Sequence, residues 1–169
     1  MKSTPENSRQ PGKPLLLIDV DGVISLFDFD PADQPPGNWL TVDGILHLCS
    51  ARAAEHLPPL GNHFELVWCT GWEEKANDYL PSEMGLAGPL PYLQFEPAAG
   101  TTRGHWKLDA IDRFAGDHRP LAWIDDGLDA ACHQWAAERP GPTLLVTTQP
   151  SEGIDQHHAL ELRTWAAQL

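Results

Sequence analysis

The stretch that decides the fold reads Leu15-Leu16-Leu17-Ile18-Asp19-Val20-Asp21-Gly22-Val23. It begins as an apolar run and ends in two carboxylates and a glycine, which is typical of a buried parallel strand whose carboxyl end opens into a polar loop. Ligands of open α/β sheets bind at such strand ends. We therefore expect an α/β protein with its first strand over about Pro14 to Asp19 and a functional site directly after it.

The spacing of Asp19 and Asp21 indicates the chemistry of that site. Residues i and i+2 of an extended segment point the same way, so the two carboxylates are expected to converge on one small volume. Carboxylates held that close repel each other unless a cation or a shared proton intervenes. The pair favours a hard divalent metal, with one carboxylate free for nucleophilic or acid–base work. The alternative is a strand followed by an ordinary Asp-Gly turn.

Two later segments also run from apolar residues into polar ones. Residues 64–72 end in a hydroxyl and a glycine, and residues 121–127 end in paired carboxylates. A lysine lies between them, near the start of an amphipathic stretch. In chain order, these polar residues are Thr70, Gly71, Lys107, Asp125 and Asp126.

Strand ends that supply Asp-x-Asp, Thr, Lys and Asp-Asp in this order resemble the four motifs of the haloacid dehalogenase (HAD) superfamily of phosphatases and phosphotransferases. The resemblance spans residues 14 to about 150. The tryptophan-rich forms at 67–72, 105–107 and 122–126 look most like the small bacterial HAD group associated with predicted RNA-repair systems. The resemblance implies a Rossmann-like HAD fold and a Mg²⁺-dependent phosphomonoester hydrolase.

The resemblance also implies roles for single residues. Asp19 would attack phosphorus and form an aspartyl-phosphate. Asp21 would protonate the leaving oxygen and then deprotonate the attacking water, while its main-chain carbonyl binds Mg²⁺. In Asp-Asp members of the family the second aspartate is the usual direct ligand, so Asp126 is favoured, with Asp125 in the outer shell. Asp129 would either orient these carboxylates or be a carboxylate at a helix start, favoured by the helix macrodipole.

Thr70 and Gly71 would bind a phosphoryl oxygen through the hydroxyl and the backbone amide. Thr70 also fits a capping box with Glu73, and both roles can hold in part because a hydroxyl donates and accepts. Lys107 would neutralise the phosphoryl group and Asp19, the alternative being an ordinary surface lysine. Three aromatic residues are candidate substrate contacts, with core packing as the alternative for the tryptophans. These residues are Trp72, His105 and Trp106.

The sequence pattern predicts about five parallel strands with helices on both faces of the sheet. Short strands at 24–29 and 38–42 are expected to form a β-hairpin flap around a proline-rich turn. Between the second and third motifs no lid of any size is expected, so the cap is minimal and the site open. Further strands are predicted at 92–95 and 143–147, and helices at 44–56, 73–80, 106–115, 128–138 and 155–168.

The 169 residues fit a single domain over 14–169 after a polar tail at 1–13, which we expect to be disordered. The formal net charge of −13 disfavours binding to long duplex nucleic acid through a basic surface. We expect a small phosphorylated substrate, nucleotides included, and a protein partner or homodimer that closes the open site. The lack of a membrane-spanning run or signal peptide predicts a cytoplasmic protein. The odd number of cysteines, Cys49, Cys69 and Cys132, predicts reduced thiols.

Three other functions use the same residues. A phosphotransferase would pass the phosphoryl group to an alcohol, a nucleic-acid end phosphatase would work within a repair complex, and a noncatalytic scaffold would only bind phosphate.

Overall fold

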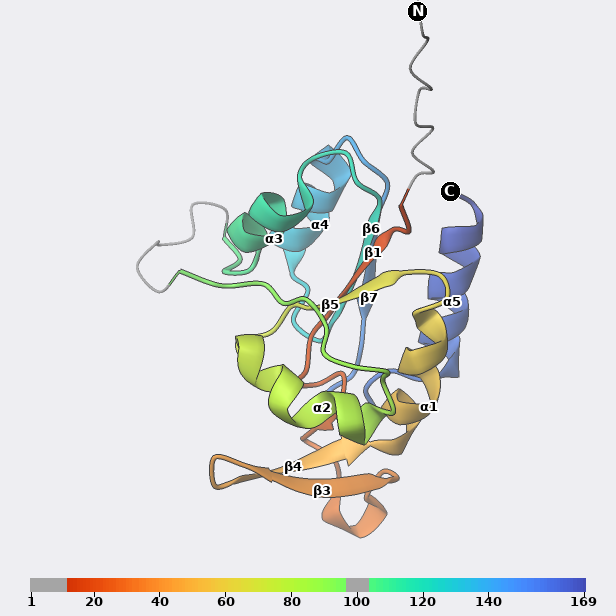
Figure 1. Cartoon of the computed structure of the whole chain (residues 1–169). Coiled ribbons are helices and arrows are strands. Elements are labelled where there is room, and N and C mark those ends of the chain that lie inside the picture. Colours follow the sequence, from red (N-terminus) through yellow and green to blue (C-terminus); the bar gives the residue numbers. More distant parts are fainter. Residues whose placement is uncertain (1–11, 97–103) are drawn as a thin grey trace, which may run out of the picture.

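A parallel sheet forms the centre of the molecule in the computed structural model, which describes residues 12–96 and 104–169 (Figure 1). Residues that follow neighbouring strands of a parallel sheet meet at the same edge. The strand order places the first strand between the two strands that precede Thr70 and Asp126. The strands lie in the order β5 (Glu65–Trp68), β1 (Leu15–Ile18), β6 (Leu121–Asp125) and β7 (Thr143–Thr147).

Helices cover both faces of the sheet. In the described ranges they are α1 (Ala51–Leu60), α2 (Ala76–Met84), α3 (Leu108–Ala115), α4 (Ala130–Glu138) and α5 (Gln156–Ala167). Leu16 and Ile18 of β1 pack in a core with α1, α2 and α5, whereas Leu15 and Leu17 pack in a second core with α3 and α4. Successive residues of a strand point to opposite faces, so a strand buried on both sides is apolar throughout. The predicted α/β class, with a parallel sheet flanked by helices, is confirmed, and the arrangement is compatible with a Rossmann-like fold.

The sheet has four strands rather than about five. Tyr92 makes only an isolated parallel bridge to Trp68, where the predicted strand at 92–95 should pair with β5. Two backbone hydrogen bonds form there, Trp68 to Pro91 and Leu93 to Trp68. The Phe95 amide then donates to the Glu73 side chain at 3.2 Å. That side-chain acceptor replaces the next bond of a ladder, so the segment does not continue as a strand.

The flap differs from its predicted form. It is a three-stranded antiparallel sheet in the order β2 (Ser25–Leu26), β4 (Ile45–Ser50), β3 (Gly37–Val42), so the segment at 24–29 pairs with β4 and not with β3. A short 3₁₀ helix, η1 (Pro31–Asp33), precedes β3. The predicted helix at 44–56 is wrong, because residues 45–50 are β4 and α1 begins only at Ala51.

A two-residue turn and a helix cap explain why residues 45–50 form a strand and why α1 begins only at Ala51. Asp43 and Gly44 join β3 to β4 with φ values of 51° and 81°. Asp-Gly with two positive φ angles is the favoured connection of a tight hairpin. Ser50 then caps α1, its side chain accepting the Ala53 amide at 3.1 Å.

The other predicted helices are confirmed within a few residues. The helix expected at 73–80 begins as a 3₁₀ turn, η2 (Glu73–Lys75), and continues as α2 to Met84. It ends at Gly85, whose φ of 68° is typical of a helix C-terminus. Within the described ranges, η2 and α2 are the only helices or named strands between β5 and α3. No large lid domain is seen in that part of the described chain.

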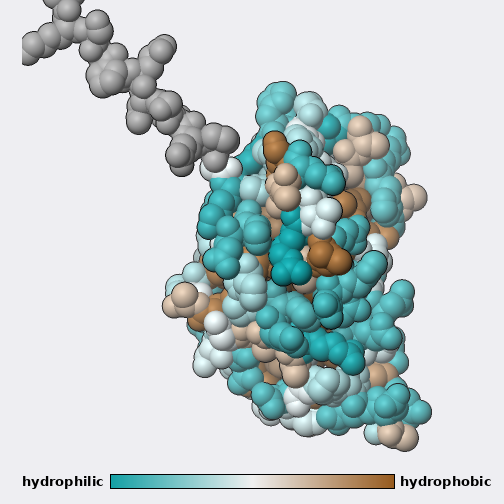
Figure 2. All heavy atoms as spheres, turned by 90° about the vertical axis from the view of Figure 1, so that its right-hand side faces the viewer, coloured by the Kyte–Doolittle hydropathy of each residue, from teal (hydrophilic) through white to brown (hydrophobic). Residues whose placement is uncertain are grey.

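The face that carries α1 and α5 is mainly hydrophilic in Figure 2, with small, separate apolar patches. Ala159 and Leu162 of α5 point inward and are buried, which leaves its polar side chains outside. None of the helices within 12–96 and 104–169 is long and apolar enough to cross a bilayer. Residues 1–11 of the predicted tail lie outside the described residues; Lys13 donates a hydrogen bond to the Gly61 carbonyl.

Candidate active site

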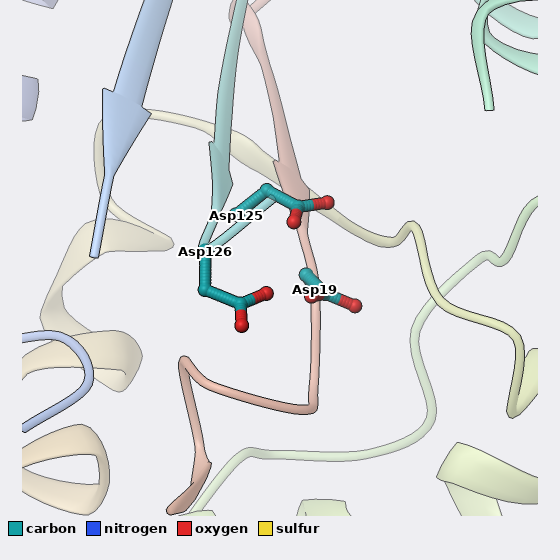
Figure 3. Close-up of side chains that lie close together, drawn as sticks. All are labelled: Asp19, Asp125 and Asp126. Carbon is teal, nitrogen blue, oxygen red and sulfur yellow. The ribbon is translucent and has the colours of Figure 1, made fainter. Parts of the chain in front are cut away.

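Three carboxylates meet at the carboxyl edge of the sheet. Asp19 directly follows β1, Asp125 is the last residue of β6, and Asp126 follows it. Each offers an oxygen, and these oxygens all lie within 4.8 Å of one another. In Figure 3 the three side chains, from two neighbouring strand ends, point toward a common space. The register explains this, because Ile18 pairs with Ile124 and the residues after both strands therefore lie side by side.

The loop after β1 passes very close to Asp126. Gly22 has a φ of 82°, and a Cβ atom at this position would lie 2.4 Å from Cγ of Asp126. Only glycine fits both the positive φ and the contact. Thr148 holds the loop in place: its hydroxyl donates to the Gly22 carbonyl at 2.8 Å, and its amide donates to the Asp125 carbonyl at 3.2 Å.

Lys107 lies among the carboxylates, so the surface alternative is wrong. Its side chain is buried, and Nζ donates to the Cys69 carbonyl at 2.8 Å and to Oδ2 of Asp125 at 2.6 Å. Oδ1 of Asp19 is 3.0 Å away. An ammonium has three hydrogens to donate, and these contacts match that number. Lys107 thus connects the ends of β1, β5 and β6.

Asp125 is held mainly by protein groups. Its Oδ2 accepts from Lys107 and, at 3.2 Å, from the Trp123 indole, while Oδ1 accepts the Gly127 amide at 2.8 Å. Asp126 is only partly buried. This difference supports the expectation that Asp126 is the direct metal ligand and Asp125 an outer-shell residue.

Burial and negative charge dominate the electrostatics of the site. Burial raises the pKa of Asp19 to about 8, and Asp125 adds to the increase, although Lys107 opposes it. Burial and Asp125 also raise the pKa of Asp126. Burial would lower the pKa of Lys107, but Cys69, Asp19 and Asp125 raise it overall, so the lysine stays charged.

A divalent cation fits these residues. Mg²⁺ prefers carboxylate oxygens and keeps several waters, and Asp19 and Asp126 offer oxygens close together. Burial is the main cause of the raised pKa values of Asp19 and Asp126, and the charge of Asp125 adds to both. A cation between them would keep both ionised.

Asp21 occupies a different place from the three carboxylates. The backbone leaves the extended conformation after Ile18, and the amides of Val23, Ile24 and Ser25 all donate to the Val20 carbonyl. Asp21 therefore does not point with Asp19 as an i+2 residue of a strand would. Its side chain is 53% exposed and accepts a hydrogen bond from the Trp72 indole at 3.2 Å. The metal role of its main-chain carbonyl stays a prediction.

Thr70 and Gly71 follow β5, beside the end of β1. Thr70 is buried, and its hydroxyl oxygen accepts the Trp72 amide at 3.2 Å. The hydroxyl keeps its own hydrogen for another acceptor. The reciprocal capping box with Glu73 is not formed, because the Glu73 carboxylate accepts the Phe95 amide instead.

The aromatic candidates divide into exposed and buried residues. Trp106 is 49% exposed, and Nζ of Lys107 lies 5.1 Å from its ring centroid. The Phe95 ring, 4.7 Å away, packs against it. His105 is buried edge-to-face against Trp123, which favours a packing role for this histidine.

The structure also locates Asp129 and the three cysteines. Asp129 is the N-cap of α4, accepting the Cys132 amide at 3.0 Å, and this accounts for its lowered pKa. Cys49, Cys69 and Cys132 are buried and form no disulfide, which is compatible with the predicted thiols.

Sequence reasoning missed His47. The residue lies on β4, where a helix was expected, and the flap brings it next to Asp21. Its neighbours come from distant parts of the chain, so no local pattern could have identified it.

The comparisons with known proteins leave the function open. No family model matches the chain, and no curated protein does. Among solved structures, a hypothetical protein from Xanthomonas campestris is similar, with 12% identity and a TM-score of 0.48 over 100% of this chain and 95% of that one. An identity and a TM-score this low carry no argument about function, so the function has to be inferred from the chain's own residues.

Proposed function

We propose that this protein is a Mg²⁺-dependent phosphomonoester hydrolase of the HAD type that acts through an aspartyl-phosphate on Asp19. One observation carries the proposal: a buried lysine lies 3.0 Å from a carboxylate that directly follows the central strand, beside two further carboxylates. A buried carboxylate next to a fixed ammonium and a cation-binding pair is equipped to attack a phosphoryl group and to stabilise its charge.

Asp19 and Asp21 would have different roles in the two steps of the reaction. A carboxylate oxygen of Asp19 forms a bond to phosphorus while the bond from phosphorus to the ester oxygen breaks. Asp21 gives its proton to that leaving oxygen. In the second step Asp21 takes a proton from water as the water attacks the phosphorus of the aspartyl-phosphate. Asp19 and free phosphate are released, and Asp21 is protonated again for the next cycle.

Thr70 would hold a phosphoryl oxygen during both steps, and Lys107 would neutralise the charge of the phosphoryl group. Lys107 also offsets the charge of Asp19 and Asp125, and the Gly71 amide adds a donor beside Thr70. Asp19, Asp126 and the Asp21 carbonyl would hold Mg²⁺, with Asp125 supporting from the outer shell. The cation would supply electrostatic stabilisation of the phosphoryl charge.

The substrate would be a small phosphomonoester with an aromatic or sugar-containing leaving group. Trp106 offers a half-exposed indole 5.1 Å from the lysine, and ring faces of this kind stack on bases. A nucleotide, or the phosphorylated end of a nucleic acid presented by a partner, fits this description. The net charge of −13 argues against unaided binding of a long duplex. A cytoplasmic location remains part of the proposal.

The proposal is tested by phosphatase assays with an aryl phosphate and with 3′- and 5′-phosphorylated nucleotides, each with Mg²⁺ and with EDTA. We expect Mg²⁺-dependent phosphate release by the wild type. Asp19→Asn should retain less than about a tenth of the rate, because an amide cannot form the acyl phosphate. Acid-quenched wild-type protein should carry phosphate on Asp19 by mass spectrometry.

Asp33→Asn is the matched control, since it makes the same change on an exposed residue of η1. It should behave like the wild type. Full activity of a pure Asp19→Asn protein, or equal activity in EDTA, would overturn the proposal.

A further inference from the structure

Asp21 stands apart from the other acidic residues of the site because little of it is buried. Its side chain is 53% exposed, whereas that of Asp19 is 9% exposed. An exposed carboxylate samples several rotamers unless neighbours hold it. A group that must give a proton to one atom and take one from another needs a defined position.

Two rings contact the Asp21 carboxylate from different parts of the chain. The Trp72 indole, after β5, donates to Oδ2 at 3.2 Å. Nδ1 of His47, on β4 of the flap, lies 4.0 Å from Oδ1. The two rings also touch each other edge-on, with centroids 4.9 Å apart and planes at 67°. The carboxylate thus contacts one ring from the flap and one from the loop after β5.

His47 is itself held in place. Oγ of Ser25 lies 2.8 Å from Nδ1, and Ser25 is buried on β2. Ser25 also forms a backbone bridge with Asp21, and its carbonyl accepts the Gly22 amide at 2.8 Å. The loop of Asp21, the strand β2 and the histidine of β4 therefore form one connected unit. The histidine side chain is 16% exposed, so it faces the site and not bulk solvent.

We propose that His47 is a positioning residue for Asp21, and that through it the flap controls how well Asp21 transfers protons. The inference rests on the proposed function. The 4.0 Å separation exceeds a hydrogen bond, and Nδ1 is already hydrogen-bonded to Oγ of Ser25, so the imidazole limits the rotamers of Asp21 by packing beside Oδ1 and against the Trp72 indole.

The experiment compares substrates that need the proton to different extents. An alkyl phosphate has a poor leaving group and depends on Asp21, whereas an activated aryl phosphate leaves without help. We expect His47→Ala to lower kcat for the alkyl phosphate about 10- to 100-fold, since misplacing a catalytic group by about 1 Å costs on the order of 100-fold. With the aryl phosphate, the variant should release a burst of phenol at the wild-type rate and then turn over slowly.

Two variants separate positioning from general damage to the flap. His47→Asn places an amide near the position of Nδ1 and should restore most of the alkyl phosphate activity. Leu46→Ala changes an exposed neighbour on the same strand, 64% accessible, and should match the wild type. Equal losses on both substrates in the first turnover, equal effects of Leu46→Ala and His47→Ala, or no effect of His47→Ala would each overturn the inference.

A spectroscopic readout keeps the two proposals distinguishable. The indole N–H signal of Trp72, assigned with Trp72→Phe, reports its hydrogen bond to Asp21. We expect His47→Ala to shift or broaden this signal and His47→Asn to restore it, whether or not a phosphatase substrate is found. A wild type inactive on every phosphate would end the proposed function. An unchanged indole signal in His47→Ala would end this inference alone.

Discussion

Gly22 has a backbone conformation that favours glycine, and it also lies in direct contact with the Asp126 carboxylate of the site. Its φ of 82° lies in the left-handed region, and the space where a side chain would begin is filled by Asp126. Gly44 has nearly the same φ, 81°, but nothing lies within 4 Å of its missing Cβ. Both glycines therefore need a positive φ angle, but only Gly22 lies where a Cβ atom would clash with Asp126.

Substituting each glycine by alanine separates these two effects. Gly44→Ala should lower the free energy of unfolding by about 1 to 2 kcal/mol, the usual cost of a left-handed alanine. Gly22→Ala should cost more than Gly44→Ala and also abolish the stabilisation by Mg²⁺, because Asp126 must move. Urea unfolding with and without Mg²⁺ measures both quantities. Equal Mg²⁺ stabilisation in the two variants would show that Gly22 has no part in the proposed cation site.

Site residues could be predicted from the sequence where the residues next to them in the chain carry the signal, and not where their position depends on distant contacts. Asp19, Asp125 and Asp126 follow apolar strands, and parallel strands place such residues at one edge. Lys107 was predicted only through the family resemblance. The orientation of Asp21 could not be predicted, because it depends on the turn around the Val20 carbonyl, and His47 depends on long-range pairing in the flap.

At the scale of elements, the helix caps show how single side chains fix boundaries. Asp155 caps α5 in a reciprocal arrangement: its carboxylate accepts the His158 amide at 3.1 Å, and its own amide donates to the His158 ring. Burial would raise the pKa of Asp155, but these hydrogen bonds and the two histidines of the first turn lower it overall.

Asp155→Ala should therefore destabilise the protein by about 1 kcal/mol at neutral pH. The folded-state pKa of Asp155 is lowered, so its contribution is present above the unfolded-state pKa and disappears as pH falls through the folded value. Chemical unfolding at neutral pH and at a pH of about 3, below the ordinary aspartate value, measures the difference. Asp155→Asn, which can still cap a helix, should lose less. A constant difference across this range would mean that the carboxylate charge contributes nothing.

Prediction from the sequence worked well for β1, β5, β6 and β7, because each is an apolar run with turn residues at its ends. It failed for β4, whose residues are compatible with helical periodicity. The decisive local signal was Asp43-Gly44, a hairpin turn that outweighs the helical pattern once β3 is available for pairing. The strand predicted at 92–95 was wrong for another reason: the Phe95 amide donates to the Glu73 side chain and not to a backbone carbonyl of a neighbouring strand.

At the scale of the whole molecule, the cation should stabilise the fold. A ligand that binds only the folded state at about 100 times its dissociation constant adds about 2.7 kcal/mol. We expect the melting temperature to rise with Mg²⁺ and to fall back with EDTA. Asp126→Asn should lose this dependence, whereas Asp33→Asn should keep it. Identical melting curves of the wild type with and without saturating Mg²⁺ would contradict a metal role for the three carboxylates.

The central position of β1 determines when the carboxylates of the site can come together. β1 precedes the other strands of its sheet along the chain, yet its pairing partner β6 lies about one hundred residues later, so the contact is formed against a large loop-closure entropy. A growing chain that has not reached Asp126 carries Asp19 without the carboxylates opposite it. The three carboxylates therefore come together only when β6 pairs with β1, and a truncation before this strand would leave Asp19 without Asp125 and Asp126.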